Sequence, residues 1–93
     1  MLTICVFVAD DPPEGGEARA VKVVQAAAAR FPGQVTVEVL PVAGERGEAL
    51  GLRLSPTVVE GDMVLSVGEQ LSAGRLKRYI EMRLCEEAGA ARP

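Results

Sequence analysis

The most reactive side chains belong to two cysteines, Cys5 and Cys85, because the chain contains no histidine. Cys5 lies in the middle of an apolar run at residues 2–8, where we expect a small core residue. Burial in apolar surroundings raises the pKa of a thiol and makes it inert. Cys85, near the end of the chain, is expected to be a partly covered surface residue. The pair lacks the spacing of metal ligands and the cysteine density of a disulfide scaffold, so no metal and no cofactor is expected.

Four acidic residues follow the apolar run: Asp10, Asp11, Glu14 and Glu17. A site for a hard cation needs oxygen ligands that converge from several directions. Helix capping and solvated surface explain the same group more simply, because acidic residues are favoured at the positive end of a helix. We therefore interpret the group as a cap and a solvated acidic loop in preference to a cation site.

The overall charge argues against a nucleic-acid partner. The formal net charge is −3, and the chain contains no tryptophan on which bases could stack. Basic residues are scattered, apart from Arg75, Lys77 and Arg78. The apolar run at residues 2–9 is too short to span a bilayer, and no basic segment or cleavage site accompanies it. We expect a cytoplasmic protein with no membrane contact.

Apolar periodicity predicts one domain at residues 1–87 and a frayed C-terminal tail at residues 88–93. Seven elements are expected in the order β-α-β-α-β-β-α. They are a strand at 2–8, a helix at 17–31, a strand at 35–40, a short helix at 45–52, two hairpin strands joined at Gly61-Asp62, and a helix that Ser72 caps and that ends near Glu86.

The strand patterns predict how the elements pack. Residues 2–8 are nearly all apolar, as in a strand buried on both faces, and the first two strands should be parallel. Residues 35–40 alternate, so Val35, Val37 and Val39 are expected to face inward from an edge strand. In the last helix, Leu76, Ile80 and Leu84 should face inward and Arg83 should face water. These expectations describe an α/β fold with a four-stranded mixed sheet and helices on both faces.

One segment is more specific than the element order. Leu54-Ser55-Pro56-Thr57-Val58-Val59 is followed by the turn at Gly61-Asp62 and by Gly68 ahead of the last helix. Together these features resemble the C-terminal half of the thioredoxin-like superfamily, at the size of a small thioredoxin or glutaredoxin. The resemblance covers residues 1 to about 87. It implies a thioredoxin-like fold with a cis peptide bond between Ser55 and Pro56, facing the loop at residues 10–16.

The resemblance fails at the residues that carry redox chemistry. Redox-active relatives have a Cys-x-x-Cys motif just after the first strand, where the helix N-terminus lowers the pKa of the first cysteine. The corresponding stretch at residues 9–16 contains no cysteine. The binding geometry beside the proline is independent of the thiols, and the resemblance implies that Ser55, Pro56 and Thr57 pair with an extended ligand. The simpler alternative is that Pro56 only shapes the turn.

Two classes of function remain. The first is a redox-inactive thioredoxin-like protein that binds an unknown protein partner through a groove formed by Asp10, Asp11, Glu14 and the segment Ser55-Pro56-Thr57. The second is a thiol-disulfide or glutathione-linked oxidoreductase that uses a non-standard cysteine. The outer edge of the strand at residues 35–40 is a competing interaction site, where two subunits of a homodimer would pair.

Overall fold

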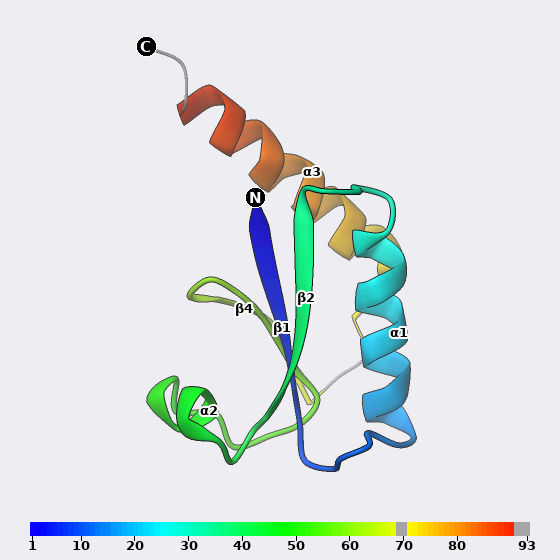
Figure 1. Ribbon diagram of the computed structural model, residues 1–93, viewed down its shortest axis with the longest axis vertical. Helices are drawn as coiled ribbons and strands as arrows, with labels where there is room; N and C mark the ends of the chain where they lie inside the picture. The colour runs from blue at the N-terminus through cyan, green and yellow to red at the C-terminus, as the bar shows by residue number, and fades with distance from the viewer. Residues whose placement is uncertain (69–70, 91–93) are drawn as a thin grey trace.

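The computed structural model describes residues 1–68 and 71–90 and has the element order predicted from the sequence (Figure 1). The elements are β1 (Leu2–Val8), α1 (Gly16–Ala28), β2 (Val35–Pro41), α2 (Glu45–Ala49), β3 (Thr57–Glu60), β4 (Met63–Val67) and α3 (Ala73–Ala90).

The four strands form one mixed sheet in the order β2-β1-β3-β4. β1 and β2 are parallel, with Leu2 opposite Val35, whereas β1–β3 and β3–β4 are antiparallel. The hairpin turns at Gly61, whose φ of 59° is the positive value that a two-residue turn requires at its first position. The parallel pairing of the first two strands and the hairpin are both confirmed.

Both faces of β1 are buried, as its continuous apolar sequence predicted. Its even-numbered residues, such as Ile4, pack with α1, α3 and Val58 in the larger core cluster. Cys5 and Phe7 point the other way and pack with Val59 in a second cluster, which Leu52 covers from the segment after α2. Figure 1 shows α1 and α2 on opposite sides of the sheet. A strand buried on both faces therefore anchors the whole fold.

The helix boundaries differ from those expected. α1 ends at Ala28, and Phe31 packs on the core from the following turn. α2 ends at Ala49, and it contains Gly47, where an added Cβ would overlap the carbonyl oxygen of Val42. A glycine at this position lets the short helix approach the chain that leaves β2.

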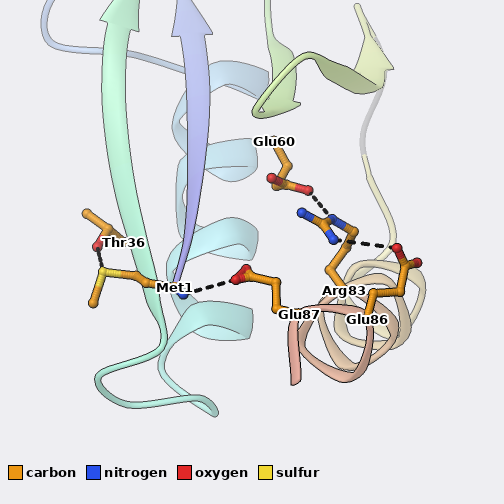
Figure 2. A network of polar contacts seen from close by, with 6 residues as sticks. All are labelled: Met1, Thr36, Glu60, Arg83, Glu86 and Glu87. Carbon is orange, nitrogen blue, oxygen red and sulfur yellow. Dashed lines mark hydrogen bonds and ion pairs between the residues drawn. The ribbon is translucent and has the colours of Figure 1, made fainter. Parts of the chain in front are cut away.

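The last helix is longer than predicted. α3 continues to Ala90 rather than ending near Glu86, and the rest of the expected tail, residues 91–93, lies outside the described residues. The N-terminal ammonium of Met1 bonds Glu87 Oε2 at 3.1 Å and ties this part of the helix to β1 (Figure 2). The predicted fraying therefore does not begin at Ala88.

Arg83 was predicted to face water and instead holds the hairpin against α3. Its Nε donates to Glu60 Oε1 at 2.7 Å, and its Nη1 lies 3.5 Å from Glu86 Oε2 (Figure 2). The hydroxyl of Tyr79 donates to the same Glu60 oxygen, also at 2.7 Å. The expectation for Arg83 was wrong because Glu60 is buried at the end of β3 and needs donors from α3.

The predicted orientation of Val39 was also wrong. It was predicted to face inward with Val35 and Val37, but it is 41% exposed. Val35 and Val37 pack on the core, whereas Val39 lies near the end of β2, beside the loop that follows β1. The loop does not cover it, and an open pocket results.

Candidate functional site

The candidate site lies where β1 ends and α1 begins, and Glu17 is its centre. The side chain of Glu17 turns back from the first turn of α1, so that its Oε2 accepts a hydrogen bond from the Ala9 N–H at 2.6 Å. Its Oε1 accepts a longer bond from the Asp10 N–H at 3.3 Å. Glu17 is only 7% exposed. The carboxylate therefore closes the loop onto the start of its own helix.

Glu17 also connects the loop to the proline turn. The polar side chain of Ser55 is the largest cause that lowers the pKa of Glu17, followed by the backbone N–H of Ala9. Burial raises the pKa in part, but the donors outweigh it. The negative charge of Glu17 is thus stabilised between the loop that follows β1 and the proline turn, which were predicted to face each other. The interpretation of Glu17 as a cap or solvated residue was wrong.

The proline turn is mostly buried, and its polar groups form hydrogen bonds within the chain. The Ser55–Pro56 peptide bond is cis, as expected, and the Asp11–Pro12 bond is cis as well, which was not expected. Ser55 is half-buried, whereas Pro56 and Thr57 are buried. The hydroxyl of Thr57 donates to the carbonyl oxygen of Leu54 at 2.6 Å, and the Gly68 N–H donates to the Pro56 carbonyl at 2.8 Å. The Pro56 carbonyl is therefore already paired within the chain.

The other predicted residues lie on the surface. Asp10, Asp11 and Glu14 are all exposed. The N-cap of α1 is Gly15, with a φ of 57° and no side-chain cap, so the expectation that the acidic group caps this helix was wrong. Within residues 1–68 and 71–90, no group of three or more His, Cys, Asp or Glu residues is arranged to hold a metal ion.

A pocket of about 440 Å³ opens beside this loop. Asp10 and Asp11 line it together with the exposed Val39 and other apolar residues. The lining residues are Val8, Ala9, Asp10, Asp11, Pro13, Val21, Val39, Leu40 and Pro41. We call this the loop pocket. Neither Pro56 nor Thr57 lines it, so the structure separates the predicted groove into an accessible acidic part and a buried proline part.

The two cysteines lie away from Glu17. Cys5 is buried on the face of the sheet opposite α1, where its Sγ lies 3.8 Å from Glu38 Oε2. Burial raises the pKa of the Cys5 thiol, and the Glu38 carboxylate adds to the rise although Arg46 opposes it. Cys85 is exposed on α3, so the expectation of a partly covered residue was wrong. Neither thiol is placed at the start of α1.

The fold and the site define an α/β protein with a four-stranded mixed sheet, three helices and a buried carboxylate at the end of the first strand. No protein-family model matches the chain, and no curated protein matches it either. None of the helices in the described part of the chain is both long enough and apolar enough to cross a membrane.

Proposed function

We propose that this chain is a redox-inactive domain of the thioredoxin-like superfamily, and that it binds another protein. The fold part of the proposal is supported by the parallel β1–β2 pair, the antiparallel hairpin and the position of Pro56 directly before β3. These are the features that the resemblance implies, although the superfamily itself is inferred from their combination.

One observation carries the functional part. The first turn of α1, where a redox-active relative has its nucleophilic cysteine, carries the Glu17 carboxylate. A carboxylate cannot exchange disulfides, and its negative charge disfavours a thiolate nearby. Its two oxygens also accept the N–H groups of Ala9 and Asp10, so these donors are unavailable to a ligand. The position is therefore structural, and binding uses the surface beside it.

The loop pocket is the surface that we assign to the partner. Its apolar lining residues, which include Val39, suit an apolar side chain, and Asp10 and Asp11 favour basic groups next to that side chain. Attraction between exposed charges speeds association and is screened by salt. The expected partner therefore presents an apolar residue flanked by lysine or arginine, and it binds more slowly as ionic strength rises.

A thiol-linked oxidoreductase is the second candidate, and the exposure of Cys85 is the observation that favours it. In that case Cys85 would exchange disulfides with a partner that supplies the second thiol. This chemistry would take place on α3, without the helix N-terminus that activates the nucleophile in redox-active relatives.

Thiol titration and turnover assays distinguish the two candidates. In the native protein we expect one thiol per chain to react with a chromogenic disulfide reagent, and the Cys85→Ser variant should abolish that reaction. Cys5 should react only after denaturation, because it is buried. No turnover is expected in insulin-reduction or glutathione-dithiol assays. Turnover that disappears in Cys85→Ser would reject the proposal in favour of the oxidoreductase.

A further inference from the structure

The loop pocket requires a partner with an apolar side chain next to a basic group, and the chain itself carries such a segment. Among the large apolar side chains that are exposed in the described part of the chain, Leu54 and Met82 are the two that lie next to an arginine or a lysine in the sequence. Leu54 follows Arg53, and Met82 precedes Arg83. Arg83 already bonds two carboxylates within its own chain. Arg53-Leu54 is therefore the segment that matches the pocket.

Both residues of this segment are accessible. Leu54 is 57% exposed, Arg53 is exposed as well, and none of the ion pairs between described residues involves Arg53. The Leu54 side chain lies beside Gly68, where an added Cβ would be 3.6 Å from Leu54 Cδ1. Contact with the chain at the end of β4 restricts the rotamers of Leu54, so less side-chain entropy is lost when this leucine binds. The segment is thus both exposed and partly preorganised.

Leu54 does not line the loop pocket of its own chain. The pocket includes Val39 and Pro41 of β2, whereas Leu54 precedes β3. In the sheet order β2-β1-β3-β4, β1 separates these two strands. This leucine therefore occupies a loop pocket by binding to another molecule.

The loop pocket and the segment Arg53-Leu54 lie at the same end of the sheet. β1 ends and β3 begins there, since Phe7 pairs with Thr57. Glu17 bonds the loop after β1, and the polar side chain of Ser55 lowers the pKa of Glu17, so the loop and the segment are adjacent. Figure 1 shows the loop after β1 and the chain between α2 and β3 at this end. A twofold axis that passes between two adjoining surfaces brings each of them onto the other surface of the second molecule.

We infer that a second copy of this chain occupies the loop pocket, in a twofold dimer in which each copy inserts Leu54 into the loop pocket of the other. The inference rests on the proposed function, because it names the partner of the same pocket. Leu54 contacts the apolar lining residues, such as Val39, and its burial favours association. The Arg53 guanidinium lies next to the Asp10 and Asp11 carboxylates, which take part in none of the ion pairs between described residues. The interface is isologous, so each dimer contains this contact twice.

The test is sedimentation equilibrium of the full chain at micromolar to millimolar concentration. Wild-type protein should have twice the mass of one chain and should dissociate more as salt concentration rises. Arg53→Glu puts a carboxylate opposite the two aspartates, and Asp10→Lys with Asp11→Lys puts two ammonium groups opposite Arg53. Each of these variants alone should therefore dimerise at least tenfold more weakly than wild type.

An equimolar mixture of the two charge variants should regain most of the lost affinity. In the mixed dimer, one contact joins the carboxylate introduced at position 53 to the ammonium groups introduced at positions 10 and 11. The other contact keeps the original charges. Leu54→Ser removes the apolar side chain from both contacts and should weaken the dimer by at least tenfold.

Matched controls make the same changes at exposed positions away from this end of the sheet. They are Met82→Ser, Arg30→Glu, and Glu81→Lys with Glu86→Lys, and they should leave the dimer unchanged. Circular dichroism should show that all variants are folded.

Three results would overturn the inference: a monomeric wild-type protein at millimolar concentration, a dimer that Leu54→Ser does not weaken, or a mixture of the charge variants that is no more dimeric than each variant alone. These results concern the second copy and leave the proposed function open to a different partner. Turnover that depends on Cys85 rejects the proposed function itself, whatever mass the protein has.

Discussion

Replacing Glu17 with alanine should lower the free energy of unfolding by about 2–4 kcal/mol, because two hydrogen bonds to a charged group are lost and their donors must find water. The donors are the backbone N–H groups of Ala9 and Asp10, which connect the end of β1 to the start of α1. Urea denaturation measures the change. Glu14→Ala is the matched control, since Glu14 is exposed in the same loop, and it should change stability by less than about 0.5 kcal/mol.

The Glu17 bonds also predict a pH dependence. The folded state lowers the pKa of Glu17 below its ordinary value of 4.5, so the unfolded state binds the proton more readily. The stabilisation is therefore complete above pH 4.5 and is lost as the pH falls through the folded pKa. Glu17→Gln should remove this component of acid destabilisation, so its stability curve should be flatter than the wild-type curve in that range. Parallel curves for the two proteins would contradict the assigned role of Glu17.

Replacing Glu60 with glutamine should lower the ionisation midpoint of Tyr79. Burial is the largest cause that raises the pKa of Tyr79 to about 12, and the hydrogen bond to Glu60 and the negative charge of Glu60 add to it. Tyr79 is the one tyrosine in the chain, and there is no tryptophan, so absorbance of tyrosinate at 295 nm reports on this residue alone. The midpoint should lie near 12 in the wild-type protein and move toward 10 in Glu60→Gln.

The same contact contributes to stability. Burial raises the pKa of Glu60, but the hydrogen bonds from Arg83 and Tyr79 outweigh it and leave the pKa below its ordinary value. Because the folded state raises the pKa of Tyr79, its contribution to stability is present below pH 10 and is lost as the pH rises toward about 12. Glu60→Ala should lower the free energy of unfolding by about 1–3 kcal/mol, since two charge-assisted hydrogen bonds disappear.

Glu86→Ala provides a control for the Glu60 variants, because Glu86 contacts Arg83 from an exposed position on the same helix. It should change stability by less than about 0.5 kcal/mol and leave the Tyr79 midpoint near 12. An unchanged midpoint in Glu60→Gln would show that Glu60 does not raise the pKa of Tyr79 in solution.

Local patterns were sufficient to predict the order of the elements, the burial of β1 and the hairpin. The continuous apolar run of β1 indicated burial on both faces, and Gly61-Asp62 between two apolar segments indicated the hairpin. Both predictions depend only on residues that are adjacent in the sequence. Helix ends were less accurate: α3 continues beyond Glu86, and the Met1 ammonium, far away in the sequence, bonds Glu87 in this added part.

The site required contacts that no local pattern contains. Glu17 has the sequence context of an ordinary acidic residue at a helix start, and only the return of the chain from β1 places two N–H groups next to it. Arg83 has the spacing of a solvated helix residue, yet Glu60 lies within its reach across the hairpin. Val39 continues the alternation of Val35 and Val37, but the loop after β1 leaves it uncovered.

We propose that this domain binds a protein partner through the loop pocket without thiol chemistry. The most direct measurement captures partners from source-cell extract on immobilised wild-type protein, on Asp10→Lys with Asp11→Lys, and on Cys85→Ser. The control for the charge change is Glu45→Lys with Glu48→Lys, two exposed acidic residues on α2. We predict that the aspartate variant loses a partner that wild type, Cys85→Ser and the α2 control all retain. Retention by the aspartate variant together with loss in Cys85→Ser would contradict the claim and favour the oxidoreductase.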